Sequence, residues 1–236
     1  MGVLDPFWES KGYVTPAEFR RFCNSTVVLA RMGQRVFTTG ERLTADIEIA
    51  HFGRSPIRDA VAQWQLLDER GVTVARGSFS AVTVPVGNGT ALGTVDLALS
   101  SLPAPHRYTL VAGLKGMRVD NTWDIWIYPQ TVDTLPPAGV TITDVLDEDA
   151  LIVLRNGGKV LWLVPPARVK GDAQGKVKIG FSSIFWNTAW TSRQPPHTLG
   201  ILCDPAHRAF AAFPTEGHSN WQWWYLVHNA GAMILD

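Results

Sequence analysis

The stretch Leu43–Phe52, LTADIEIAHF, decides which fold the first half of the chain adopts. Apolar residues alternate there with Thr44, Asp46 and Glu48. Successive side chains of a β-strand point to opposite faces, so this alternation predicts a strand with one buried face and one face in water.

Segments with the same alternation extend from about Val27 to Pro129, with turn residues between them. They lie at residues 35–38, 62–68, 72–79, 93–97, 106–114 and 120–128. About seven short strands at this spacing, with no helical pattern among them, predict an immunoglobulin-like antiparallel β-sandwich. Gly87-Asn88-Gly89 is read as a turn. The Cys–Trp–Cys signature of true immunoglobulin domains is absent from the sequence.

Residues 1–26 precede this pattern and predict an N-terminal arm with one short helix. In Thr15-Pro16-Ala17-Glu18, Thr15 is suited to cap the helix, Pro16 to open it and Glu18 to bond back to the cap amide. The helix is expected to end near Cys23. The arm would belong to a region beyond the chain or lie across the domains that follow.

The stretch QTVDTLPPAG, residues 130–139, is a Thr- and Pro-rich connector. Such composition is typical of a domain boundary. We therefore expect a sandwich over 27–130, a linker over 131–139 and an α/β domain over 140–236.

The pattern after the linker predicts alternating strands and helices. We expect strands at 140–143, 159–164, 198–203 and 232–235, a helix at 147–155 that stops at Asn156-Gly157-Gly158, and a second helix from Asn220 capped by Ser219. The continuous apolar run at 159–164 is typical of a parallel strand covered on both faces. Together these elements predict a small Rossmann- or amidotransferase-like α/β domain, which the chain could contain incompletely.

Composition excludes several classes of partner. Lys plus Arg and Asp plus Glu both number 21, so no net field attracts nucleic acid or an anionic membrane. No apolar run is long enough to span a bilayer, and the first residues lack a signal-peptide pattern. As the chain stands, a cytoplasmic location is expected. Cys23 and Cys203 lack CxxC spacing and are expected to be buried apolar residues.

Residues 181–225 contain five of the ten tryptophans together with amides, carboxylates and histidines. Aromatic rings can stack on pyranose faces while polar side chains bond sugar hydroxyls. The candidate carbohydrate-binding residues are Trp186, Asn187, Trp190, His197, Glu216, His218 and Trp221. The alternative, that these tryptophans pack a small domain or fill a contact with a neighbouring one, stays open.

Catalytic chemistry is less well supported by the sequence. If the chain were an enzyme, Glu216, Asp204 and His218 would be its catalytic residues, because glycosidases use two carboxyl groups. The cluster Asp147–Asp149 is explained by its place at a helix start, where acids complement the helix dipole. The histidines and cysteines show no zinc-ligand spacing, and Cys203 lacks a glycine-flanked elbow, so we expect no metal, no cofactor and no nucleophilic cysteine.

Several long motifs carry a resemblance to a known family. They are LDPFWESKGYVTPAEFRRFC, RVFTTGERLTADIEIAHFG, NTWDIWIYP, NGGKVLWLVP, FSSIFWNTAW, PHTLGILCDPAH and FPTEGHSNWQWW. With them the chain resembles, over essentially its whole length, the region after the catalytic barrel in bacterial glycoside hydrolases of family 2 type (β-galactosidase-like, sugar-binding-domain proteins). In such enzymes the catalytic glutamates lie on a TIM barrel, which would precede Met1. The resemblance therefore implies that they have no counterpart here.

The expected function is that of a non-catalytic accessory region, structural or carbohydrate-binding, in carbohydrate degradation. One alternative is a stand-alone carbohydrate-binding module that uses Trp186, Trp190 and Trp221 as platforms. Another is a small glycoside hydrolase. The resemblance implies a catalytic barrel domain or partner subunit as a neighbour, and apolar surface left exposed by its absence would favour a homo-oligomer.

Overall fold

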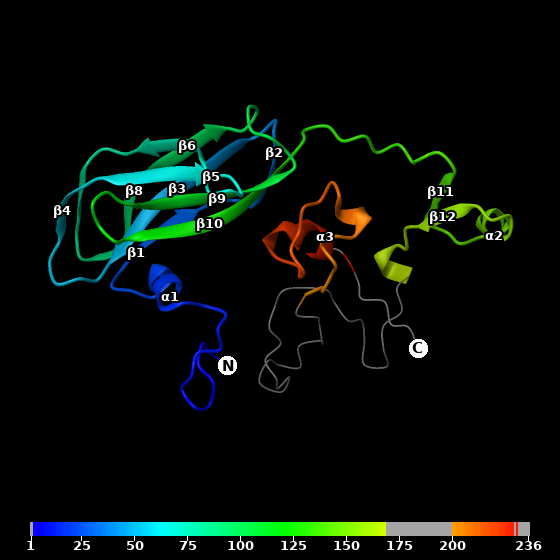
Figure 1. The fold of residues 1–236 in the computed structure, drawn as a ribbon. Coiled ribbons are helices and arrows are strands. Elements are labelled where there is room, and N and C mark those ends of the chain that lie inside the picture. The colour runs from blue at the N-terminus through cyan, green and yellow to red at the C-terminus, as the bar shows by residue number, and fades with distance from the viewer. Residues whose placement is uncertain (1, 169–199, 229, 231–236) are drawn as a thin grey trace. The chain divides into compact units, whose positions relative to one another are not determined.

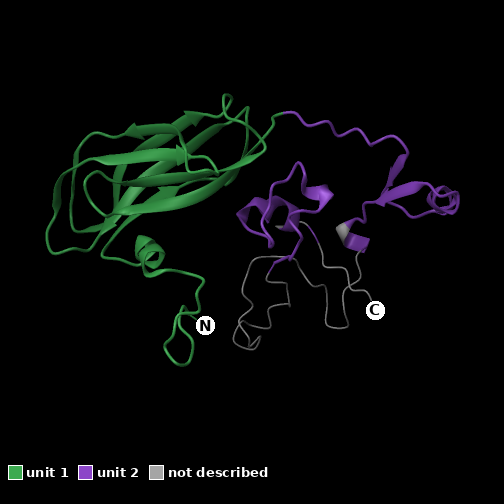
Figure 2. Ribbon diagram, in the orientation of Figure 1, with its two compact units in different colours: residues 1–130 green, residues 131–236 purple. Residues whose placement is uncertain are grey.

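The computed structural model describes residues 2–168, 200–228 and 230, and the chain divides into two compact units. Unit 1 comprises residues 1–130 and unit 2 residues 131–236 (Figure 2). The described residues are mostly β, arranged in several sheets, none of which closes into a barrel.

Unit 1 contains two main sheets that lie face to face (Figure 1). The three-stranded sheet has the order β1 (Thr26–Arg31), β3 (Arg42–His51), β8 (Gly87–Ala98). The five-stranded sheet has the order β2 (Val36–Thr38), β10 (Asp120–Tyr128), β9 (His106–Leu114), β5 (Ala62–Leu67), β6 (Thr73–Ser78). Neighbouring strands pair antiparallel except β2 and β10, which are parallel. A small pair, β4 (Ile57–Ala60) and β7 (Val82–Val84), completes the unit.

The alternation in β3 has the predicted effect. Leu43, Ala45, Ile47 and Ile49 are buried, whereas Thr44, Asp46 and Glu48 point away from them. Side chains from the five-stranded sheet join the same hydrophobic cluster; among them are Leu66, Leu110 and Ile125, all completely buried. Fully burying one such side chain stabilises the fold by about 1.5–3 kcal/mol, so this shared cluster is the main source of stability in unit 1.

One predicted turn in unit 1 is wrong. Gly87-Asn88-Gly89 lies inside β8, which begins at Gly87 and pairs with β3. The glycines adopt positive φ, +150° at Gly87 and +74° at Gly89, and the pairing register shifts between Ile49 and His51. Glycine thus allows an irregular strand end here rather than a chain reversal. Strands β1, β4 and β7 are not among the predicted ones.

The predicted N-terminal helix is confirmed as α1 (Pro16–Phe22). The backbone N–H of Glu18 donates to Thr15 Oγ1 at 3.3 Å, and the Glu18 carboxylate accepts from the Thr15 N–H at 2.7 Å. Hydrogen bonds from the Thr15 side chain and backbone lower the pKa of Glu18. Arg21 Nε lies 3.2 Å from Asp120 Oδ1, so an ion pair ties α1 to strand β10 of the sandwich.

In unit 2 the first predicted β–α–β segment is present. Strands β11 (Val140–Thr143) and β12 (Lys159–Trp162) pair in parallel, and α2 (Glu148–Arg155) connects them. The Asp147 carboxylate caps α2 by accepting from the Ala150 N–H at 3.0 Å. Gly157 follows the helix with φ +76°, which ends it at the predicted stop.

The predicted Rossmann- or amidotransferase-like sheet is not seen among the described residues. The sheet containing β11 and β12 has only two strands there. Leu161 and Trp162 are 48% and 40% exposed, and Ala150 is the only buried residue of α2. The apolar run at 159–164 was expected to be covered on both faces. That expectation is wrong for the described part of the chain, because no further strand or helix covers it there.

The second predicted β–α–β segment is also corrected. Residues 200–203 form no strand, only an isolated antiparallel bridge between Leu202 and His218. The following helix begins as the 3₁₀ turn η3 (Trp221–Trp223) and continues as α3 (Trp224–His228). Its N-cap is Asn220, one residue after the predicted Ser219. The Ser219 hydroxyl instead accepts a hydrogen bond from the Ile201 N–H. The predicted strand at 232–235 lies outside the described residues.

The two cysteines differ from their prediction. Cys23 is exposed, because it caps the C-terminus of α1 and follows the helix into a loop. Cys203 is partly buried, and its thiol donates to the backbone oxygen of Glu216 at 3.2 Å. Both thiols are free, as their spacing suggested.

Candidate functional site

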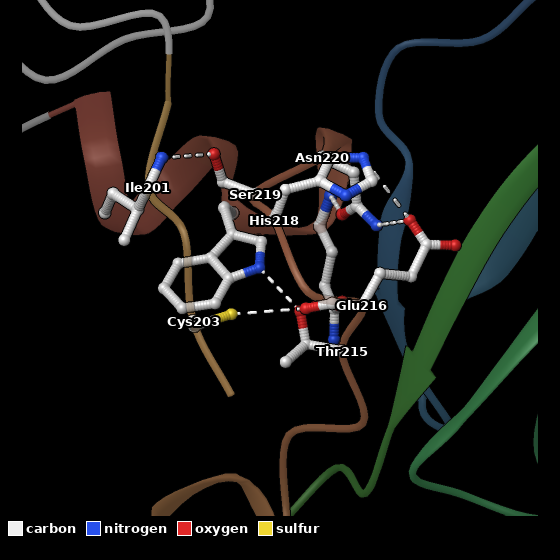
Figure 3. Close-up of polar contacts among 9 residues, drawn as sticks. Ile201, Cys203, Thr215, Glu216, His218, Ser219 and Asn220 are labelled. Carbon is white, nitrogen blue, oxygen red and sulfur yellow. Dashed lines mark hydrogen bonds and ion pairs between the residues drawn. The ribbon is translucent and has the colours of Figure 1, made fainter. Parts of the chain in front are cut away.

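The candidate site lies in residues 200–228, where two extended segments are held side by side (Figure 3). The Ser219 N–H donates to the Ile201 oxygen at 2.8 Å, and the Ile201 N–H donates to Ser219 Oγ at 2.9 Å. The Cys203 N–H donates to the Gly217 oxygen at 3.1 Å. Backbone and hydroxyl bonds thus fix residues 216–220 against residues 201–203.

Trp223 packs against residues 210–215, which precede this extended segment. It is 7% exposed and packs edge-on against Phe210 and Phe213, with ring centroids 5.7 and 5.0 Å away. Its indole N–H donates to Thr215 Oγ1 at 2.8 Å. A buried indole with a satisfied N–H is a packing residue. The packing alternative therefore holds for Trp223.

Glu216, His218 and Asn220 form a polar group on the extended segment (Figure 3). The Asn220 amide donates to Glu216 Oε2 at 3.2 Å, and His218 Nε2 lies 3.9 Å from the same oxygen. The three residues are spaced by two, which places them on one side of an extended chain. The side chains of Glu216 and His218 are 44% and 65% exposed, so a ligand in solution can reach them.

Two partly exposed indoles follow this polar group directly in the sequence. Trp221 is 56% and Trp224 41% exposed, and their ring centroids lie 5.7 Å apart with an interplanar angle of 41°. The spacing of three residues brings them to the same side of a helical turn. Exposed rings together with an amide, a carboxylate and an imidazole are the groups that a sugar-binding surface uses.

Asp204, the third predicted catalytic residue, has a local structural role. Its Oδ1 accepts from the Ala206 N–H at 3.0 Å, and its backbone oxygen accepts from the His207 N–H at 3.0 Å. The ring Nδ1 of His207 in turn accepts from the Ala209 N–H at 3.2 Å and caps the short helix η2 (Arg208–Phe210). The structure thus brings Glu216 and His218 together, while the Asp204 carboxylate forms a turn.

The remaining candidate residues are Trp186, Asn187, Trp190 and His197, which lie outside the described residues. Sequence reasoning missed Trp224, although its spacing from Trp221 signals a shared face. It also assigned Ser219 as the helix cap, a role that Asn220 has.

No cluster of three or more metal-ligating side chains occurs within 2–168, 200–228 and 230. Nor does any helix in these residues combine the length and apolar character that crossing a membrane requires.

Two family profiles match parts of the chain. One is described as "Domain of unknown function (DUF8488)" and matches residues 41–129, within unit 1. The other is described as "Domain of unknown function (DUF8487)" and matches residues 141–236, within unit 2. No curated protein matches the sequence.

Solved structures share a weak likeness with the chain. A β-glucuronidase of Parabacteroides merdae is 12% identical, with 44% of this chain and 14% of that enzyme covered and a TM-score of 0.32. A cycloisomaltooligosaccharide glucanotransferase of Paenibacillus sp. is 15% identical, with 50% and 16% covered and a TM-score of 0.34. The CARDB domain of a Pyrococcus furiosus protein is 9% identical, with 45% and 93% covered and a TM-score of 0.33. The chain thus spans only a small part of the two enzymes.

Proposed function

We propose that this chain is a non-catalytic accessory region of a family 2-type glycoside hydrolase, and that residues 216–224 contact carbohydrate. The observation that carries the proposal is the pair of exposed indoles, Trp221 and Trp224, which directly follows the polar group of Glu216, His218 and Asn220 in the sequence. Long sequence motifs that resemble the post-barrel region of such enzymes support it independently.

The described contacts of Glu216 suit a binding role. A glycosidase needs two carboxyl groups, about 5–5.5 Å apart for retention or about 6.5–9.5 Å for inversion. The neighbours described for the Glu216 carboxylate are an amide and an imidazole, and the Asp204 carboxylate is engaged in its own turn. A carboxylate held by an amide is suited to accept hydrogen bonds from sugar hydroxyls.

Unit 1 would serve as an immunoglobulin-like support. Two features favour this finer assignment. The buried Tyr108, near the start of β9, donates its hydroxyl to the Pro103 oxygen at 2.7 Å, as in the tyrosine corner of immunoglobulin-like domains. Strands from both sheets share one core cluster, which is the arrangement of a β-sandwich.

The carbohydrate contact is tested by titrating the protein with galactosides, xylan and cellulose oligosaccharides and following tryptophan fluorescence. We expect saturable quenching by at least one saccharide, and its loss in Trp221→Ala. Trp162→Ala is the matched control, because Trp162 is 40% exposed but belongs to strand β12. Equal quenching in wild type and Trp221→Ala would reject the binding surface.

A neighbouring domain or subunit is a further part of the proposal. Phe7, Trp8, Tyr13 and Phe22 of the arm are 82%, 81%, 65% and 60% exposed. The Asp5 carboxylate fixes the turn that carries Phe7 and Trp8, because its Oδ1 accepts from the N–H groups of Phe7 and Glu9 at 2.8 and 2.9 Å. Ordered, exposed aromatic side chains are typical of contact surfaces.

Light scattering across a dilution series tests this contact. A dimer or higher oligomer that dissociates on dilution, and is weakened by Phe7→Ser with Trp8→Ser, is the expected result for the isolated chain. A mass of one chain at every concentration, with the arm still exposed to proteolysis, would reject self-association through the arm.

A further inference from the structure

The outward face of the five-stranded sheet in unit 1 carries an ordered set of polar side chains. Strands β6, β5, β9 and β10 lie side by side in it (Figure 1). Gln65 pairs with Arg76 on β6 and Val111 on β9, and Gln63 pairs with Ser78 on β6. The alternate residues Trp64 and Leu66 pack toward the core, so the glutamines point to the opposite face.

A cavity of about 610 Å³ lies on this face. Its lining includes Gln63, Gln65, Arg76, Ser78, Gly113 and Lys115. Gly113 lines the cavity at a point where the backbone of residues 119–120 approaches too closely for a side chain. A Cβ atom would lie 2.6 Å from the Val119 backbone oxygen. The volume falls within the range of small-ligand sites, about 300–1,000 Å³.

The charges in this cavity are not balanced. Arg76 and Lys115 line it, and neither forms an ion pair with any residue that the structure describes. The one acid in the lining, Asp120, lies 3.2 Å from Arg21 Nε and is thereby already paired. The cavity therefore presents two cations whose charge no described acid offsets.

A second cavity of about 400 Å³ continues along the same face and shares Gln65, Val111 and Asp120 with the first. Its lining holds two cations, Arg21 and Arg107, and three acids, Asp68, Glu69 and Asp120. Arg21 pairs with Asp120, and the Glu69 carboxylate accepts from the backbone N–H of Arg107 at 3.1 Å. The two cavities thus form one groove with an excess of positive charge at the end where Arg76 and Lys115 lie.

We propose that this groove binds an acidic oligosaccharide, whose oxyanion, a carboxylate or a sulfate ester, lies between Arg76 and Lys115. The amides of Gln63 and Gln65 and the hydroxyl of Ser78 can each donate and accept hydrogen bonds, which suits sugar hydroxyls. Arginine binds oxyanions through two parallel N–H groups, and lysine adds a point charge. This site goes beyond the proposed function, because it lies in unit 1 and selects for charge.

A solvated sheet face explains the polar residues but not the groove. Antiparallel sheets often have one face in water, with polar side chains alternating along each strand. Such a face needs neither a cavity of this volume nor two cations in its lining without an unpaired acid. A ligand that supplies the missing negative charge accounts for both features.

Isothermal titration of the whole chain tests the proposal with three probes: trigalacturonate, a sulfated galactose disaccharide and neutral galactotriose. We expect at least one acidic probe to bind, with an affinity about tenfold or more above that of galactotriose. Arg76→Gln and Lys115→Gln should each weaken binding about fivefold or more, and the double variant should abolish it. Arg58→Gln removes the same charge from exposed strand β4 and should leave affinity unchanged.

Three results would overturn the proposal. They are the absence of binding by both acidic probes at millimolar concentration, equal affinity for galactotriose, and equal affinity for inorganic phosphate at matched ionic strength, which would indicate a bare anion site. Trp221→Ala separates this site from the carbohydrate contact in unit 2. Acidic probes should bind that variant as they bind the wild type, so either site can fail without the other.

Discussion

Units 1 and 2 bury their apolar residues differently. In unit 1, completely buried side chains from both sheets, such as Leu43, Leu110 and Ile125, form one cluster. In the described part of unit 2, the only apolar residues less than a tenth exposed are Ala150, Trp223 and Val227. Alternation gives each strand of unit 1 a face to bury against the opposite sheet, whereas a parallel β–α–β segment needs further layers to cover it.

The largest effect expected from this difference concerns leucine truncation. Leu110→Ala should lower the free energy of unfolding of unit 1 by about 2–5 kcal/mol, because Leu110 is fully buried and leaves a cavity. Leu161→Ala is the matched change in unit 2, where Leu161 is 48% exposed, and it should cost less than about 1 kcal/mol. Urea unfolding followed by circular dichroism measures both. Equal losses would mean that β12 is buried as deeply as β9.

The next effect concerns Tyr108, which holds the start of β9. Tyr108→Phe removes the hydrogen bond to the Pro103 oxygen and should cost about 1 kcal/mol. Burial, followed by the charges of Asp68 and Glu69, raises the pKa of Tyr108. Its contribution is therefore complete below the unfolded pKa of about 10 and is lost as pH rises through the folded pKa. Stability of the Tyr108→Phe variant should therefore fall less steeply at alkaline pH than that of the wild type. An unchanged pH profile would mean that ionisation of Tyr108 does not cause the loss.

The smallest effect concerns an exposed carboxylate of unit 1. Hydrogen bonds from the Thr38 N–H and then from the Gln34 amide lower the pKa of Glu41. Its contribution is present above the unfolded pKa of about 4.3 and is lost as pH falls through the folded pKa. Glu41→Gln should therefore make stability slightly less dependent on pH in acid, as measured by thermal unfolding between neutral and acidic buffers. A steeper acid loss in the variant would contradict the assignment.

Local patterns predicted local structure well. The Thr15 to Glu18 capping box, the alternation of β3 and the Gly157 stop each depend on neighbours in sequence, and all three occur in the structure. Gly87 to Gly89 were misread because glycine serves irregular strands as well as turns. The Ser219 cap was misread because its hydroxyl accepts instead from the Ile201 N–H, a partner 18 residues away.

The candidate site was predictable only in part. The aromatic density pointed to residues 181–225 and Trp221 was named as a candidate, but composition does not report exposure, so nothing in the sequence showed that Trp223 would differ from it. The structure separates them as packing residue and exposed ring. The polar groove in unit 1 had no sequence signal, because it depends on cross-strand pairing between Gln65, Arg76 and Val111.

The central proposal is that this chain binds carbohydrate without cleaving it. The most direct measurement is turnover of nitrophenyl β-galactoside and β-glucuronide by the purified chain, with Glu216→Gln assayed beside it. The Glu216 carboxylate accepts a hydrogen bond from the Asn220 amide, and the Asp204 carboxylate accepts one from the Ala206 N–H in a turn. We therefore predict no turnover by either protein. Turnover by the wild type that Glu216→Gln abolishes would contradict the accessory role and establish Glu216 as a catalytic residue.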